Sequence, residues 1–237
     1  MSSRSAPLLF AFALAVGGCG SADKDSAARA EVSAPVAGEA ATAGEGARSG
    51  AIAAAVRVAA STYARETRGS KLRLETGRIA RDAVLLRALA AGNAPAAQAE
   101  LESQLLSPAN HFEHVTRISV VDGLRVLANA TLNSDGTFVV APAQVALALH
   151  GRHLGTLLVS IQDVTGFVKL VHRRTLAGVV VRGTSGQVRA SPPVAARARL
   201  PLSGSATIAG RRYVVRSFRE LGWGGERLTV WILERAS

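Results

Sequence analysis

Histidines and one glycine-flanked serine are the residues with the clearest potential for chemistry. His111, Glu113 and His114 have a spacing that could place metal ligands on one helix face, but they form no His-Glu-x-x-His motif and no further ligand follows nearby. In Gly183–Gly186, Gly-Thr-Ser-Gly, the second glycine comes too early for a hydrolase nucleophile elbow. The sequence also lacks a phosphate-binding loop and a dinucleotide-binding fingerprint. We therefore expect no metal, no cofactor and no enzymatic activity, and interpret the His111 segment as a helix end.

The charge of the chain points to an anionic partner. Lysine and arginine number 28 against 17 acidic residues, a net charge of +11. From Ala51 onwards 24 basic residues face 12 acidic ones, which raises the excess to +12. Such a surface attracts anionic ligands, lipid headgroups or cell-wall polymers. The lysines are Lys24, Lys71 and Lys169, and the dominance of arginine can equally reflect genome composition.

The N-terminus has the pattern of a secretory signal. Within residues 1–18, Arg4 precedes an apolar run, Pro7–Val16, that is too short to span a bilayer. Val16-Gly-Gly-Cys19 resembles the lipobox of bacterial lipoproteins, in which the cysteine thiol receives diacylglycerol; a plain signal peptide with an incidental cysteine is the alternative. Cys19 is the only cysteine, so lipidation leaves neither a disulfide nor a free thiol. We expect an extracytoplasmic protein anchored in the membrane by lipid, where nucleic acid is not an expected partner.

Composition divides the rest of the chain into two parts. Residues 19–50 are rich in alanine, glycine and serine without apolar periodicity, and we expect them to form a disordered tether. Residues 51–237 have the length of one domain.

Helix patterns come first in this domain. Apolar residues at helical spacing predict one helix that ends near Gly69 and a second that stops at Gly92-Asn93. Asn93 can cap a third helix, which ends before Pro108. The apolar positions are Ile52, Val56, Ala59 and Tyr63 in the first helix, Ile79, Ala83, Leu86 and Ala90 in the second, and Leu101, Leu105 and Leu106 in the third.

Strand patterns follow from Val115. Asp122-Gly123 between two apolar strands predicts a hairpin with a two-residue turn. The run Leu154–Ile161 predicts a buried strand, and Phe167 begins a short helix after it. Further hairpins are expected around 145–161, 179–189, 205–218 and 212–233. Helices followed by consecutive hairpins indicate an α+β protein with an antiparallel sheet.

Two segments carry a family resemblance: Gly151–Leu157, Gly-Arg-His-Leu-Gly-Thr-Leu, before the strand and the Phe167 helix, and Gly204–Tyr213. With the order of elements, they resemble the Cache domain, a PAS-like extracytoplasmic sensor module. The resemblance implies N-terminal helices packed on a PAS-like antiparallel sheet in a single domain over 51–237. It also implies a small-ligand pocket between the sheet, the strand-to-helix connection and the facing loops.

The resemblance also suggests where a ligand binds. An acidic residue that holds the ligand amine in amino-acid-binding relatives is replaced here by Ser160, and the nearest acids are Asp163 and Glu220. This departure favours a carboxylate or another anion, for which Arg182, Tyr213 and Arg216 are the candidates. Strand alternation puts Tyr213 and Arg216 on opposite faces unless a bulge intervenes.

Aromatic residues give the last candidates. Phe167 could stack on a ligand, although an aromatic residue at helical spacing is more often part of the core. Trp231 is expected in the core, and Trp223, in a glycine-rich turn, is expected to be exposed.

Two functions remain open. The first is a lipid-anchored sensor that binds a small anionic metabolite and signals through a partner protein, because no output segment follows the predicted sheet. The alternative is an envelope interaction or structural lipoprotein whose arginine-rich surface binds an anionic polymer or another protein. A hydrolase has no positive support. Fold resemblance alone does not decide between them.

Overall fold

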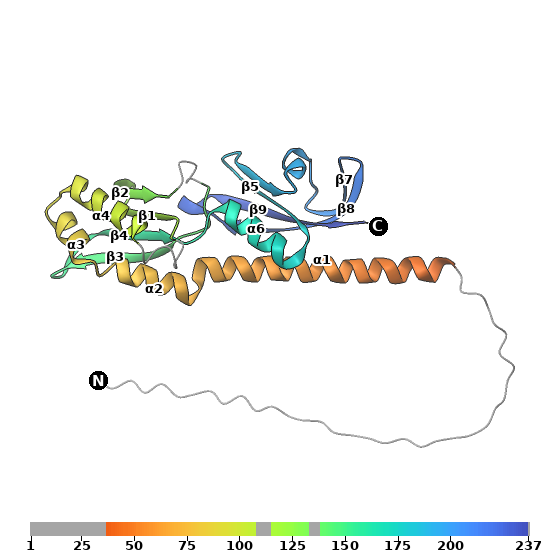
Figure 1. Ribbon diagram of the computed structural model, residues 1–237, viewed down its shortest axis with the longest axis horizontal. Helices are drawn as coiled ribbons and strands as arrows, with labels where there is room; N and C mark the ends of the chain where they lie inside the picture. Colours follow the sequence, from red (N-terminus) through yellow and green to blue (C-terminus); the bar gives the residue numbers. More distant parts are fainter. Residues whose placement is uncertain (1–36, 108–114, 133–137, 237) are drawn as a thin grey trace, which may run out of the picture.

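Two antiparallel sheets lie one after the other along the kinked line of the first two helices, α1 and α2 (Figure 1). The structure is a computed structural model, which describes the backbone of residues 37–107, 115–132 and 138–236, and the side chains in these ranges from Ser49 onwards. The strand orders are β2-β1-β4-β3 in the first sheet and β6-β5-β9-β8-β7 in the second. We refer to each sheet with the helices packed on it as the first and the second module.

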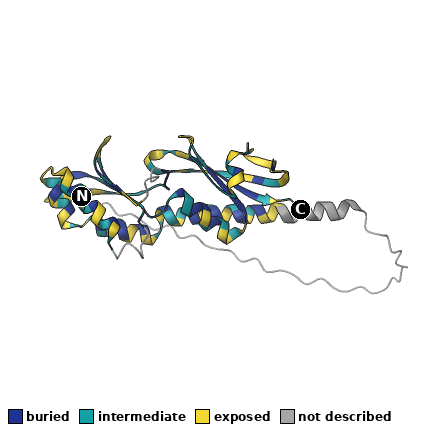
Figure 2. Ribbon diagram, turned by 45° about the horizontal axis from the view of Figure 1, so that its top comes forward, coloured by how far each residue is buried: buried dark blue, intermediate teal, exposed yellow. Residues whose placement is uncertain are grey.

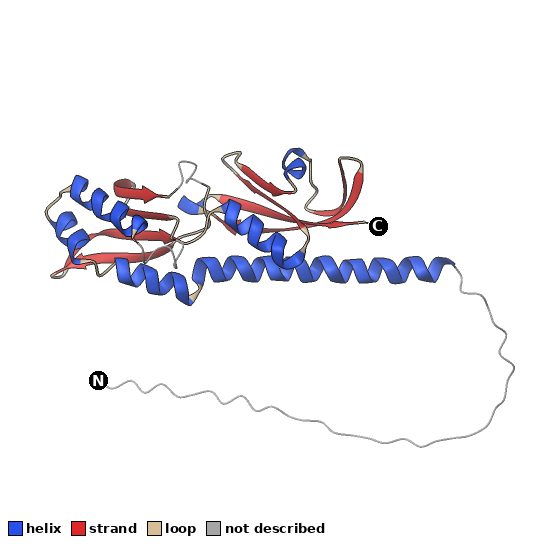
Figure 3. Ribbon diagram, in the orientation of Figure 1, coloured by secondary structure: helices blue, strands red, loops and turns tan. Residues whose placement is uncertain are grey.

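The first module contains α2 (Ser70–Ile79), α3 (Ala83–Ala90), α4 (Ala94–Leu106), β1 (Arg117–Asp122), β2 (Arg125–Thr131), β3 (Ala143–Leu149) and β4 (Arg152–Ser160). The second module contains α1 (Ala37–Arg68), α6 (Val164–Thr175), β5 (Gly178–Gly183), β6 (Val188–Ser191), β7 (Ser203–Ile208), β8 (Arg211–Leu221) and β9 (Arg227–Arg235). Two 3-10 turns, η1 (Pro193–Arg197) and η2 (Trp223–Gly225), connect its strands. Figure 3 shows how α1 follows the second sheet and continues through a kink into α2 beside the first sheet.

The predicted α+β class, with N-terminal helices packed on antiparallel sheet, is confirmed. The predicted hairpins also form, but the strands are shared between two sheets, whereas we expected one. Helix α6 separates the two sets, and β5 pairs with β6 and β9 and with none of β1 to β4. In the first hairpin the two-residue turn is Gly123-Leu124, one position later than predicted, because Asp122 pairs with Arg125.

Helix α1 begins at Ala37, so residues 37–50, which we assigned to the tether, are helical. Alanine has the highest intrinsic helix propensity, and a helix can therefore continue where an apolar stripe is missing. Residues 1–36, including Cys19 and the predicted signal peptide, lie outside the described part of the chain. Within the described residues, none of the helices combines the length and apolar character needed to cross a membrane.

The second predicted helix is divided into two. The apolar positions of that helix continue across residues 80–82, where the helix is interrupted. Asp82 caps the start of α3, and its Oδ1 accepts hydrogen bonds of 2.8 Å from the backbone N–H groups of Val84 and Leu85. Asn93 caps α4 as predicted, accepting from the N–H of Ala96 at 3.1 Å. Four helices therefore precede the strands in the described residues, against the three expected.

Buried residues gather where the helices meet the sheets (Figure 2). In the first module, α2, α3 and α4 share one core with one face of the sheet. In the second module, cores lie on both faces: α1 and α6 cover one, and η1 with its flanking loop covers the other. Strand β5 accordingly buries consecutive valines, Val179 and Val181 toward the helices and Val180 toward η1. Trp231 belongs to the η1 core, as predicted.

The chain around residues 138–142 connects the modules. Val140 N–H donates to the carbonyl oxygen of Gln162 (3.2 Å), and Trp223 N–H donates to that of Val139 (3.0 Å). Trp223 is only half-exposed, because the guanidinium of Arg117 in β1 lies over its ring, 4.4 Å from the centroid. The first module thus contacts the β8–β9 turn of the second through the Arg117 side chain, and the connecting segment contacts the same turn through its backbone.

Candidate functional site

The predicted ligand residues Ser160 and Asp163 take structural roles at the strand-to-helix connection. Ser160 ends β4 and is fully buried, and its hydroxyl donates to the carbonyl oxygen of Gln162 at 3.2 Å. Asp163 caps α6, its carboxylate accepting a hydrogen bond from the backbone N–H of Gly166. Ser160 has no exposed surface with which to reach a ligand in this conformation.

Phe167 lies in the core of the second module. Its ring has no exposed surface and meets the ring of Tyr63 edge-on, with centroids 5.3 Å apart and planes at 88°. This arrangement is favourable for aromatic pairs and fixes α6 against α1.

The predicted anion-binding set is divided between the two faces of the second sheet. Arg182 lies over the ring of Trp231, 5.3 Å from its centroid, and donates to the carbonyl oxygens of Ala196 and Ala198 beside η1. Tyr213 packs against the same core. Arg216 is exposed on the opposite face, where it donates to the hydroxyl of Ser49 at 3.2 Å. Arg182 and Arg216 therefore do not converge on one ligand.

A different set of residues surrounds a cleft of about 510 Å³ between α6, the end of α1, the start of α2 and the β4–α6 connection. We call it the basic cleft. Its size is in the range of small-molecule sites. Its lining consists of Arg65, Glu66, Lys71, Thr116, Ile161, Gln162, Gly166, Lys169, Leu170, Arg173 and Arg174.

Helix α6 forms one wall of the basic cleft because it is amphipathic. Its buried side carries Val164, Phe167, Val168 and Val171. Gly166, Lys169, Leu170, Arg173 and Arg174 are three or four residues apart and occupy another side. The packing of the apolar side on the second sheet turns the basic side toward the end of α1.

The opposite wall is formed at the kink between α1 and α2. Arg65 precedes and Lys71 follows Gly69, whose extended backbone interrupts the two helices. A Cβ atom at residue 69 would lie 2.3 Å from the carbonyl oxygen of Arg65. Glycine is therefore required for this close turn, which places Arg65 and Lys71 at the junction of the modules.

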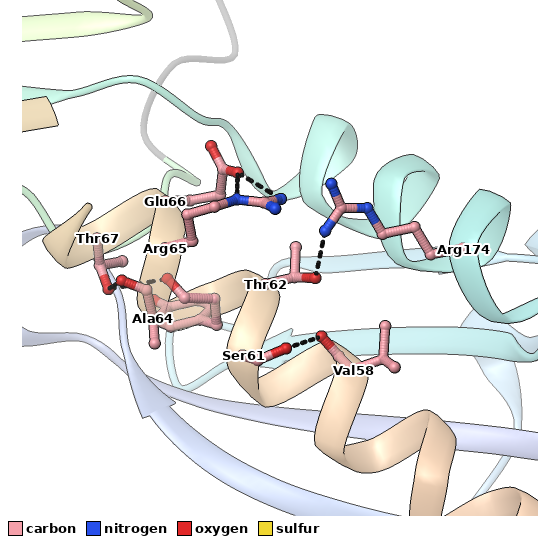
Figure 4. A network of polar contacts seen from close by, with 9 residues as sticks. Val58, Ser61, Thr62, Ala64, Arg65, Glu66, Thr67 and Arg174 are labelled. Atoms are coloured by element: carbon pink, nitrogen blue, oxygen red, sulfur yellow. Dashed lines mark hydrogen bonds and ion pairs between the residues drawn. The ribbon is translucent and has the colours of Figure 1, made fainter. Parts of the chain in front are cut away.

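Polar contacts hold the walls near each other (Figure 4). Arg174 reaches from α6 toward α1 and donates from Nη1 to the Thr62 hydroxyl at 3.2 Å. The Arg65 guanidinium extends into the same space and lies 3.3 Å from the Glu66 carboxylate. The Arg65 side chain is half-exposed, whereas that of Glu66 is only 15% exposed, so Arg65 is the more accessible partner of this ion pair.

The lining suits an anion. Five cationic side chains and one carboxylate line the basic cleft within the described residues, a net charge of +4. Arginine and lysine bind carboxylates and phosphates through charge-assisted hydrogen bonds, and a concave site of one charge sign concentrates counter-ions. Of the three lysines in the sequence, Lys71 and Lys169 both line this cleft.

Sequence reasoning identified the basic character of the chain but missed these residues. Lys71 and Lys169 entered that reasoning only as two of the three lysines. The remaining signal was the concentration of Lys169, Arg173 and Arg174 in one short helix, while Arg65 and Lys71 meet them only through the fold.

A second cavity of about 330 Å³ lies between α4 and the edge strand β2. Here the amide of Gln98 pairs with the backbone of Asn129, at 2.8 Å and 2.9 Å, and covers part of the strand edge. Glu102 is the only charged residue of its lining in the described residues, so this cavity lacks the charge that an anion requires.

Three ionisable groups near the module junction have perturbed pKa values. Burial raises the pKa of Tyr63 far above its usual range, with smaller opposing effects of the Ala141 hydrogen bond and Arg68. Burial lowers the pKa of Arg117 and raises that of Glu220, the latter opposed by Arg68.

The described residues contain no group of three or more His, Cys, Asp or Glu side chains able to hold a metal ion, and the segment of His111, Glu113 and His114 lies outside them.

Comparison with known structures finds one with a similar overall arrangement and others that match less well. The periplasmic domain of LuxQ from Vibrio cholerae superposes with a TM-score of 0.51 and 11% identity, over 78% of this chain and 99% of that domain. The ligand-binding domain of the Campylobacter jejuni chemoreceptor Tlp3, in complex with 4-methylisoleucine, gives a lower TM-score of 0.42 at 12% identity, over 79% and 92%. No protein-family model and no curated protein sequence matches the chain.

The arrangement of helices on antiparallel sheets matches the Cache-type fold that the sequence resemblance implied, and the LuxQ periplasmic domain shares this fold. At this level of identity the similarity shows the fold alone, and the ligand must be argued from the residues of this chain.

Proposed function

We propose that this chain is a ligand-binding sensor domain that works outside the cytoplasm and holds a small anionic metabolite in the basic cleft. The observation that carries the proposal is the gathering of five cationic side chains from α1, α2 and α6 around one small-molecule-sized cavity. The cleft also lies where α1 passes from the second module to the first, so a ligand there contacts both. We propose that a partner protein reads the resulting change.

Thermal unfolding tests the proposal. The chain is heated with a library of small carboxylates, phosphates, sugars and amines. A ligand at about a hundred times its dissociation constant adds roughly 2.7 kcal/mol to the free energy of unfolding. We expect selective stabilisation by anions, lost in Lys169→Ala/Arg173→Ala. The matched control Arg211→Ala/Arg212→Ala removes the same charge from exposed positions on β8 and keeps the response.

A second function is favoured by one other feature. Arg211, Arg212, Arg216 and Arg219 are all exposed along β8. Alternation along the strand puts Arg211 and Arg219 on one face and Arg212 and Arg216 on the other, and these arginines together could attract an anionic polymer or another envelope protein through long-range electrostatics. In that case the β8 double variant loses binding to isolated cell-wall polymer, small anions fail to stabilise the chain, and the cleft variant behaves as wild type.

The site of membrane attachment is also a proposal. Cys19 follows the lipobox-like segment, and we propose that its thiol carries a diacylglycerol group. Expression with a radiolabelled fatty acid should label the wild-type chain in the membrane fraction. Cys19→Ala should remove both the label and the membrane association. Labelling that persists in Cys19→Ala would contradict this assignment.

A further inference from the structure

We propose that the basic cleft selects a multiply charged anion, such as a phosphate ester or a polycarboxylate, held between two opposing basic walls. This inference rests on the proposed function, because it specifies the ligand class of the same site. One wall is α6 with Lys169, Arg173 and Arg174, and the other is the α1–α2 kink with Arg65 and Lys71.

The two walls come from separate helices and direct cations toward one space. In Figure 4 the guanidinium groups of Arg65 and Arg174 extend from α1 and α6 into the space between these helices. Lys169 and Arg173 are exposed side chains one helical turn apart on α6. Lys71 lies across the kink, in the first turn of α2. A ligand that contacts both walls must therefore offer negative charge in more than one direction.

The charge balance supports the same conclusion. Glu66 is the one carboxylate that lines the cleft in the described residues, and it is already 3.3 Å from Arg65. A singly charged anion would leave the lining strongly positive, with like charges still facing each other. An anion with two or more charges can pair with both walls and reduce their repulsion.

The remaining lining limits the size and type of the ligand. Thr116 and Gln162 offer hydrogen-bonding groups, while Ile161 and Leu170 offer a small apolar surface. The volume of about 510 Å³ suits a metabolite better than a polymer segment that runs across the surface. The cleft thus fits a compact organic anion with several charged groups.

Calorimetric titration of the whole chain at fixed ionic strength tests this selectivity, with inorganic pyrophosphate, citrate and acetate as probes. We expect pyrophosphate or citrate to bind at least about tenfold more tightly than acetate, since each can make charge-assisted contacts to both walls that acetate lacks. Equal affinity for acetate would overturn the inference and leave the proposed function standing. No binding of any of the three would overturn both.

Variants test the requirement for two walls. Lys71→Ala and Lys169→Ala each remove one cation, from the kink and from α6, and each should weaken the tighter multivalent probe about tenfold. Lys71→Arg and Lys169→Arg keep the charge and should retain binding, which separates charge from folding. Arg212→Ala, on β8, should bind as wild type. Weaker binding of the probe in only one of Lys71→Ala and Lys169→Ala would overturn the two-wall arrangement. Equally weakened binding in Arg212→Ala would overturn it too.

Discussion

Tyr63 joins three parts of the molecule through one side chain. Its hydroxyl donates to the carbonyl oxygen of Leu221 at the end of β8 and accepts from the N–H of Ala141 at 3.2 Å. Its ring packs on Phe167 of α6. With 2% of its surface exposed, this residue of α1 holds the second module to the segment that connects the modules.

Replacing Tyr63 with phenylalanine keeps the ring contact and removes the hydroxyl. We expect Tyr63→Phe to lower the free energy of unfolding by about 2 kcal/mol, because a backbone donor and acceptor lose their partner in a buried place. Urea unfolding measures the difference. Tyr213→Phe is the matched control, since no hydrogen bond of its hydroxyl is found among the described residues, and it should change stability little. Equal effects in the two variants would contradict this role.

Tyr63 also predicts a loss of stability at high pH. Burial raises its pKa in the folded protein above the usual value of about 10, so the folded state keeps the proton where the unfolded state releases it. The stability that the protonated Tyr63 side chain contributes is fully present below about pH 10. Above about pH 10 the free energy of unfolding should fall by about 1.4 kcal/mol per pH unit. Urea titrations from about pH 9 to about pH 11 test this, because Tyr63→Phe should lack that component. An unchanged slope in Tyr63→Phe would assign the loss to other groups.

Single residues were predictable where the signal was local. Asn93 was predicted as a helix cap because its type and position suffice, and Trp231 as core because it lies in an apolar strand. The acidic Asp163 was considered for ligand binding, yet the same residue type before a helix also predicts a cap. Which arginines share a cleft depends on packing between α1 and α6, and composition carries no such information.

At the scale of elements, the kink at Gly69 positions one wall of the basic cleft. Gly69→Ala would place a Cβ atom 2.3 Å from the carbonyl oxygen of Arg65. We expect the backbone to shift, with a stability loss of about 2 kcal/mol and weaker anion binding. Gly77→Ala is the control in α2, where a Cβ atom comes no closer than 3.9 Å to the Arg81 side chain. It should be neutral or stabilising by up to about 1 kcal/mol. Similar losses in both variants would contradict a special role for the kink.

The elements themselves were largely predictable, and their assembly was not. Alternating apolar residues and Gly-containing turns define each hairpin through contacts close in sequence. The division into two sheets depends on β5 pairing with β9, Gly178 opposite Leu233, which is a long-range choice. The break before α3 depends on Asp82, whose capping bonds compete with continuation of the apolar stripe.

At the scale of the whole molecule, the contact of Arg117 with Trp223 connects the modules. We expect Trp223→Ala to cost about 1 kcal/mol of stability, since it removes a partly buried cation–π contact. It should also increase hydrogen exchange in residues 138–142, whose backbone bonds cross the same junction. Leu221→Ala changes an exposed neighbour in the same turn region and should leave exchange unchanged. Equal hydrogen exchange in the two variants would indicate that the association of the two modules does not depend on the contact between Arg117 and Trp223.

Lysine labelling tests the central claim, anion binding in the basic cleft, most directly. The chain carries three lysines, of which Lys71 and Lys169 line the cleft and Lys24 precedes the described residues. The chain is reductively methylated with and without saturating inorganic pyrophosphate or citrate, and each lysine is quantified by mass spectrometry. We expect modification of Lys71 and Lys169 to fall several-fold while that of Lys24 stays the same. Unchanged modification at all three lysines, or an equal fall at all three, would contradict an anion site in this cleft.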